Sequence, residues 1–195
     1  MITAWGAAVR LFVALDLTEE IREALREPIA KLKPLGKNAR WAHPEGIHVT
    51  LKFIGHVDAS KLDAIRAALG TVQSNAAVEM QIRGVGFFPD ERRPRVFWCG
   101  IEASANLAPL AAEIERALEP LGIPREERKF APHLTLARLK DSHGVDNLVR
   151  ATEEMKSRVF GSARACEFHL FESMTKPSGA EYRKIESHAF VKGAA

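Results

Sequence analysis

The chain has 195 residues, with a hydrophobic share of 46%, a charged share of 27% and a formal net charge of +3 at pH 7. These values are ordinary for a globular protein and allow either one large domain or two small lobes packed together. No apolar run approaches the roughly 20 residues of a membrane-spanning helix, and the first residues lack the basic and apolar regions of a secretory signal. The sequence therefore predicts a cytoplasmic protein with no membrane partner.

Two cysteines, Cys99 and Cys166, lie in apolar, strand-like stretches and lack the C-x-x-C spacing. We expect both to be buried free thiols in a reducing compartment. Basic residues cluster at 92–95 and at 125–129, which are predicted loops. Such clusters in a mildly basic protein suit a polyanionic substrate, but the role of these two loops is left open.

Hydrophobic periodicity and turn residues divide the chain into alternating strands and helices. In chain order they predict a strand at 9–17, a helix at 21–32, a strand at 47–54, a helix at 62–72, strands at 78–88 and 96–102, a helix at 107–121, a strand at 134–139, a helix at 145–155, and strands at 163–173 and 182–191. Ser60 and Ser104 are the expected caps of the second and third helices. Pro28 lies inside the first helical pattern and should kink or shorten that helix.

The predicted order repeats a strand, a helix and a hairpin twice, about 85 residues apart. The fold class is therefore predicted to be α+β, a bilobal fold with pseudo-two-fold symmetry, in which two antiparallel sheets backed by helices surround a central groove. Residues 1–9 are interpreted as a flexible N-terminal extension, and residues 10–195 as one bilobal domain. Nothing in the sequence requires an oligomer, so a monomer is expected.

The pattern H-x-T-L occurs twice, as His48-Val49-Thr50-Leu51 and as His133-Leu134-Thr135-Leu136. Each copy follows a proline-containing run and leads into a short apolar segment. Residues two apart in a strand point to the same face, so each histidine shares a face with its threonine. Because the surroundings repeat together with the motif, a coincidence of two buried strands is the weaker interpretation.

Two histidines that face each other can hold opposite protonation states and act as a base and an acid. The neutral ring would take a proton from an attacking water or hydroxyl group, and the protonated ring would give one to the leaving oxygen. Thr50 and Thr135 would donate hydrogen bonds to the non-bridging phosphate oxygens, where charge shifts in the transition state. The two motifs thus predict in-line displacement at a phosphodiester.

Other kinds of site lack necessary residues. A zinc site needs at least a third ligand, and neither motif has an H-x-H or H-E-x-x-H pattern or a nearby carboxylate at ligand spacing. Gly84-Val85-Gly86 is not followed by the residues of a P-loop or a dinucleotide-binding fingerprint, and no Ser or Cys lies in a nucleophile elbow. We therefore expect a reaction that uses neither a metal nor a cofactor.

The stretches 48–55 (HVTLKFIG) and 131–138 (APHLTLAR) resemble the paired motifs of the 2H phosphoesterases. The most similar branch is that of the bacterial and archaeal RNA 2′,3′-cyclic phosphodiesterases, historically called 2′-5′ RNA ligases. Residues 10–15 (RLFVAL), 171–173 (FES) and 179–182 (GAEY) are also similar to that branch. The resemblance extends over most of the chain.

This resemblance implies a bilobal fold and the hydrolysis of a terminal RNA 2′,3′-cyclic phosphate to a 2′-phosphate, with reversible 2′-5′ joining of tRNA halves as a side activity. By position, it implies that His48 is the proton donor to the leaving oxygen and that His133 is the proton acceptor that activates water. Phe53 would stack on the terminal base. Arg138 would grip the phosphate, a role that suits the planar fork of arginine.

Phe53 and Arg138 each lie five residues after their histidine, so strict alternation would place them on the opposite face of the strand. A bulge, a strong twist or a strand end just after each motif would bring them back. Two alternative functions also stay open at this point. One is an RNA-binding module without catalytic activity, and the other is an enzyme that acts on small cyclic nucleotide phosphates.

Overall fold

The structure is a computed structural model. It describes residues 8–141, 145–176 and 179–190. The first strand begins at Ala8, and the rest of the expected N-terminal extension lies outside the described residues. In the described part of the chain, no helix is both long and apolar enough to cross a membrane.

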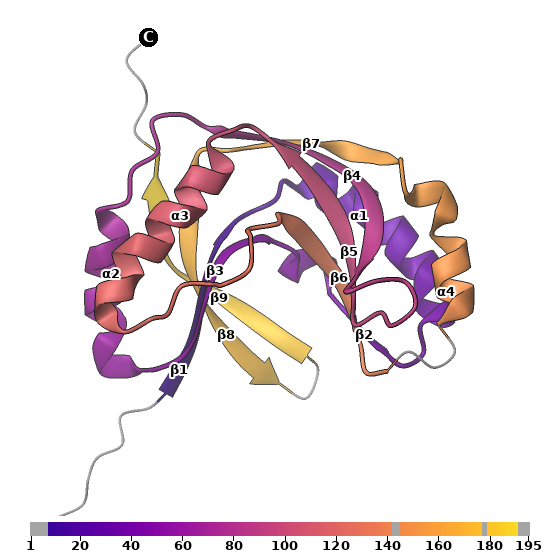
Figure 1. The fold of residues 1–195 in the computed structure, drawn as a ribbon, viewed down its shortest axis with the longest axis horizontal. Coiled ribbons are helices and arrows are strands. Elements are labelled where there is room, and N and C mark those ends of the chain that lie inside the picture. Colours follow the sequence, from indigo (N-terminus) through magenta and orange to yellow (C-terminus); the bar gives the residue numbers. More distant parts are fainter. Residues whose placement is uncertain (1–7, 142–144, 177–178, 191–195) are drawn as a thin grey trace, which may run out of the picture.

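The strands form two antiparallel sheets, which Figure 1 shows on either side of the molecule. The first sheet has the order β3-β1-β8-β9 and the second has the order β2-β6-β5-β4-β7. The strands are β1 (Ala8–Leu15), β2 (Ala39–Trp41), β3 (Val49–Asp58), β4 (Val78–Phe88), β5 (Val96–Ala103), β6 (His133–Leu139), β7 (Val159–Ala165), β8 (Glu167–Lys176) and β9 (Gly179–Ala189). The α-helices are α1 (Glu19–Leu32), α2 (Leu62–Gly70), α3 (Leu107–Leu118) and α4 (Asp146–Ala151). The predicted α+β class with two antiparallel sheets is confirmed.

The helices cross between the two halves of the chain. Helix α1 follows β1 of the first sheet, yet it packs on β7 of the second sheet. Helix α3 follows β5 of the second sheet, yet it packs on α2 and on β3 of the first sheet (Figure 1). One hydrophobic core accordingly runs through both sheets, from Leu11 in β1 to Phe97 in β5. The two lobes therefore share their core.

A bulge in β3 aims the residues after the first motif. The register of β1 against β3 shifts by one residue at Leu51, which lies between the pairs formed by Thr50 and Lys52. Leu51 and Lys52 are both buried, although neighbouring side chains of a regular strand point to opposite faces. The alternation of side chains between the two faces therefore shifts by one residue at this point. Thr50 and Phe53 then share a face, because their partners on β1 are two residues apart. Phe53 is 40% exposed on that face.

The same bulge recurs in β6. The register of β5 against β6 shifts at Leu136, between the pair of Trp98 with Thr135 and the pair of Val96 with Arg138. Since Val96 and Trp98 are two residues apart, Arg138 shares the face of Thr135. Of the three features that could bring Phe53 and Arg138 back to the face of the motif, the structure has a bulge in both motif strands. We call the side of each sheet that carries its threonine the motif face.

The predicted strand at 163–173 is wrong as a single element. The chain leaves the second sheet after β7 and enters the first sheet with β8, so the break falls at Cys166. Cys166 is exposed, against our expectation, whereas Cys99 is buried as predicted. The three-residue edge strand β2 was also not predicted, because so short a segment shows no periodicity.

Helices α2 and α3 begin at Leu62 and Leu107 as predicted, but neither is capped by the expected serine. A 3₁₀ turn precedes α2, and the Asp58 carboxylate caps it by accepting a hydrogen bond from the Ser60 N–H at 2.8 Å. Helix α3 has Asn106 at its N-cap position, and the Ser104 hydroxyl donates to the Asn106 side chain. Helix α1 runs through Pro28 and continues to Leu32. The tertiary structure thus moves helix ends by a few residues from the positions that the local signals favour.

Candidate active site

The two motif histidines have the same backbone anchor. Nδ1 of His48, just before β3, lies 2.8 Å from the carbonyl oxygen of Gly46. Nδ1 of His133, at the start of β6, lies 2.8 Å from the carbonyl oxygen of Ala131. A carbonyl can only accept, so Nδ1 carries a hydrogen in both rings. Nε2 of each ring is therefore the atom that remains to take up or give a proton.

The segment that anchors His48 is held by Arg22 of α1. Nη2 of Arg22 donates to Asp16 at 3.0 Å, and the Arg22 side chain is only 11% exposed. Its Nη1 donates to three carbonyl oxygens, those of Pro44 at 2.8 Å, Glu45 at 2.9 Å and Ile47 at 3.0 Å. The remaining carbonyl of this turn, that of Gly46, accepts from His48. Arg22 thus fixes the turn that orients the first histidine, a role that no sequence motif indicated.

Aromatic rings enclose His48 on the motif face of the first sheet. Its ring stacks on Phe12 at 4.5 Å and meets the edge of Tyr182 at 5.1 Å. This burial lowers the pKa of His48 to about 4, although the Gly46 carbonyl and the Asp16 charge favour the protonated form. The positive charges of Arg22 and Arg138 act in the same direction as burial. In the protein without substrate, His48 is therefore neutral at neutral pH.

We expect His48 to titrate with a midpoint near pH 4, well below the ordinary histidine value of 6.5. The unfolded chain would take up this proton first, near pH 6.5, so the free energy of unfolding should fall as the pH drops from 6.5 toward 4. An NMR titration of the histidine ring protons, assigned with a His48→Gln variant, measures the midpoint. A midpoint close to 6.5 would contradict the buried environment of the ring.

The second sheet surrounds His133 with different side chains. The ring of Phe88 meets His133 edge-on at 5.1 Å and is tilted against Trp98, also at 5.1 Å. Trp98 lies directly opposite Thr135 and covers Gly86, where a Cβ atom would come within 2.4 Å of the indole ring. The Trp98 Nε1 atom is buried, and no acceptor among the described residues bonds to it. Trp98 was not predicted as a site residue.

The structure brings the two motif strands together. Strands β3 and β6 contact each other between the sheets, and the charge of Arg138 on β6 acts on His48 beside β3. Thr50 and Thr135 stand on the two motif faces. Phe53 also stands there, with the guanidinium group of Arg10 5.8 Å from the centre of its ring. Arg138 of the second motif strand thus lies within electrostatic range of His48, which belongs to a distant part of the chain.

A pocket of about 330 Å³ opens beside His48. Phe171 and Tyr182 contribute to its walls, but His133 does not. Lys184 also lines the pocket, and its Nζ lies 2.8 Å from the Asp16 carboxylate and 3.3 Å from Nε2 of the buried His169. These residues were not predicted, because no repeat marks them in the sequence.

Among residues 8–141, 145–176 and 179–190, no three His, Cys, Asp or Glu side chains gather in a way that would hold a metal ion. The expectation of a reaction without metal or cofactor stays a prediction.

A profile of the 2′-5′ RNA ligase superfamily matches residues 12–174. The chain is 34% identical to the "RNA 2′,3′-cyclic phosphodiesterase" of Methanothermobacter thermautotrophicus, over 91% of this chain and 97% of that protein. It is 32% identical to the protein of the same name from Thermotoga maritima, over 95% and 97%. The crystal structure of E. coli LigT complexed with 3′-AMP is similar in fold, with a TM-score of 0.79 and 27% identity over 95% of this chain and 100% of that chain. The chain therefore belongs to the 2′-5′ RNA ligase superfamily, the 2H phosphoesterases.

Proposed function

We propose that this protein is an RNA 2′,3′-cyclic phosphodiesterase that opens the terminal ring to leave a 2′-phosphate. Relatives at 31–34% identity that the chain matches over nearly their full length bear this name. The observation that carries the proposal is the duplicated anchor, because both motif histidines turn Nδ1 to a backbone carbonyl and so leave Nε2 for chemistry. Binding alone would not require two titrating groups in matched positions.

In the proposed reaction, a water molecule attacks phosphorus from the side opposite the leaving 3′-oxygen. Nε2 of His133 takes the proton of this water as its oxygen bonds to phosphorus. The bond between phosphorus and the 3′-oxygen breaks, and His48 gives a proton from Nε2 to that oxygen. The products are a 2′-phosphate and a 3′-hydroxyl group. The family position of each motif supports this assignment of the two roles.

The other predicted residues would bind the phosphate and the terminal nucleotide. The hydroxyl groups of Thr50 and Thr135 would donate to the non-bridging oxygens from the two motif faces. Arg138 would pair with the phosphate, which suits a cation that lies within electrostatic range of the His48 ring. The exposed ring of Phe53 offers a surface on which a base can stack. The two threonine contacts would bring no further charge into the site.

The lowered pKa of His48 constrains the proposed donor role. A ring that is neutral in the free protein must gain its proton when substrate binds. The cyclic phosphate carries a negative charge, and its pairing with Arg138 would offset the positive charge that now disfavours the protonated ring. Substrate binding would therefore raise the pKa of His48. If the two roles were exchanged, His48 would act as the base, and its neutral ring in the free protein would already be in the required form.

The proposal is tested with chelator-treated protein and a short RNA that ends in a 2′,3′-cyclic phosphate. We expect ring opening without added metal, and a product whose phosphate lies on the 2′-oxygen. Protein that binds this RNA without opening the ring would instead be a binding module. Turnover that returns only with added metal would overturn the two-histidine mechanism.

Finer points of function remain proposals. Reversible 2′-5′ ligation, tRNA halves as substrates, a monomeric state and a cytoplasmic location are predictions from the sequence and from the family. A ligation assay with tRNA halves that carry a 2′,3′-cyclic phosphate and a 5′-hydroxyl group addresses the first two. Sedimentation of the purified protein addresses the monomer.

A further inference from the structure

The motif face of the second sheet ends in two adjacent arginines. Arg138 on β6 lies directly opposite Arg40 on the edge strand β2. On its other side, Arg138 lies opposite Val96 of β5. Paired residues of an antiparallel sheet project to the same face, so Arg40 extends the row that contains Arg138 on the side of Thr135. Both arginines are exposed.

Two other arginines of the sheets lie opposite glutamate, whereas Arg10 lies opposite His56. Arg164 lies opposite Glu79 and bonds to it at 3.0 Å, and Arg183 lies opposite Glu172 and bonds to it as well. Like charges directly opposite each other are destabilising, so the pairing of Arg40 with Arg138 runs against this pattern. Within the described residues, neither arginine forms an ion pair. Two unneutralised cations on one motif face form a site for anions.

We infer that Arg40 binds the phosphodiester on the 5′-oxygen of the nucleotide whose cyclic phosphate pairs with Arg138. This inference rests on the proposed function and names its substrate more closely. Successive phosphates of a single strand lie far enough apart to engage two long side chains on neighbouring strands, and β2 is the edge at which the sheet ends. The RNA strand leaves the site across β2. The contact distinguishes an RNA end from a nucleoside 2′,3′-cyclic phosphate, which has no 5′-phosphodiester.

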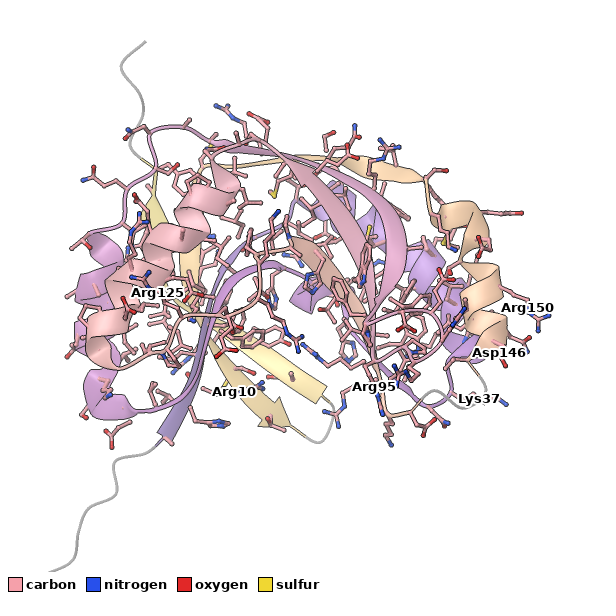
Figure 2. The ribbon with its side chains drawn as sticks, viewed as in Figure 1. Arg10, Lys37, Arg95, Arg125, Asp146 and Arg150 are labelled. Atoms are coloured by element: carbon pink, nitrogen blue, oxygen red, sulfur yellow. The ribbon has the colours of Figure 1, made fainter. Side chains whose placement is uncertain are left out.

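The backbone of this edge is held in place by the loop between β4 and β5. The Arg95 N–H group at Nη1 donates to the carbonyl oxygen of Lys140, and the Leu139 N–H donates to the Arg95 carbonyl at 2.9 Å. Arg95 of the basic loop at 92–95 is thus hydrogen-bonded to the backbone at the end of β6. Figure 2 shows Arg95 on this side of the molecule and Arg10 on the side of the first sheet. Arg10, next to Phe53, is the rival position for the same phosphate.

The test compares two dinucleotide substrates that both end in a 2′,3′-cyclic phosphate. One has an ordinary phosphodiester between its nucleosides, and its twin has an uncharged methylphosphonate there. We expect Arg40→Gln to lower kcat/KM about 10- to 100-fold on the charged substrate, the range for a lost charge-assisted hydrogen bond, and to leave the twin unaffected. Arg40→Lys should restore part of the loss as a point charge. Arg150→Gln, which removes a charge from the outer helix α4 (Figure 2), should match wild type on both.

Equal effects of Arg40→Gln on the two substrates, or no effect on either, would overturn the inference. A loss confined to the charged substrate in Arg10→Gln, with Arg40→Gln unchanged, would place the phosphate on the first sheet and also overturn it. Dissociation constants for the two 2′-phosphate products are measured alongside. If wild type opened neither ring but still bound the charged product more tightly through Arg40, the proposed function would fail and the phosphate contact would stand.

Discussion

Replacing either motif histidine by alanine should lower kcat on an RNA 2′,3′-cyclic phosphate by about 10²- to 10⁴-fold, the usual contribution of one general acid or base. The change should fall on kcat more than on KM, because each ring acts when a proton moves. His56→Ala is the matched control, since His56 is exposed on the same strand β3 as the first motif. If His48→Ala or His133→Ala kept the wild-type rate, the histidine replaced in that variant would have no part in catalysis.

A modified substrate separates the two proposed roles. If the leaving 3′-oxygen is replaced by sulfur, the thiolate departs without needing a proton. His48→Ala should then approach the wild-type rate, whereas His133→Ala should stay slow. The opposite rescue would show that the buried, neutral His48 is the base. The pH profile of wild type should be bell-shaped, with limbs that belong to the coupled pair, and a flat profile across neutrality would contradict both assignments.

Removing the partner of a buried lysine should produce the largest loss of stability. Lys52, within the first motif stretch, is 2% exposed and bonds to Glu115 of α3 at 2.7 Å. Glu115→Ala should lower the free energy of unfolding by about 3–5 kcal/mol, because it leaves a buried ammonium group without its counter-charge. The Pro124 carbonyl, which accepts from Lys52 at 2.6 Å, would neutralise none of that charge. Urea denaturation of the two proteins measures the difference.

Two further variants isolate the cause of that loss. Glu113→Ala, which breaks an exposed pair with Arg116 on the same helix, should cost about 1 kcal/mol or less. The double variant Lys52→Met with Glu115→Leu should recover most of the stability, because an apolar pair of similar volume replaces the buried ions. If Glu115→Ala lowered the free energy of unfolding no more than Glu113→Ala, the Lys52 ammonium group would have to be hydrated once its partner is removed.

The two histidine–threonine pairs could be recognised as candidates from the sequence because their signal is local. His48 and Thr50, like His133 and Thr135, share a face by alternation within one strand, which needs no partner strand. Their repetition in matched surroundings distinguished them from five other histidines. The long periodic strands were predicted for the same reason, and the predicted strand 78–88 coincides with β4.

The face to which residues beyond the motifs point was decided only by the tertiary structure. Phe53 and Arg138 reach the motif faces because β1 and β5 each skip one residue of the motif strand, at Leu51 and at Leu136. A bulge is a property of two paired strands, so neither strand shows it alone. Arg40 lies beside Arg138 for a similar reason, since β2 is too short to be seen without its partner β6.

Contacts between distant elements were likewise decided by packing. Arg22 lies on α1 and grips the turn before β3, across a separation that no sequence pattern encodes. Helices α1 and α3 pack on the sheet of the other half, because burying their apolar faces there completes one shared core. Local alternation thus determined which side chains stand together within a strand. Pairing and packing decided which strands, turns and charges surround them.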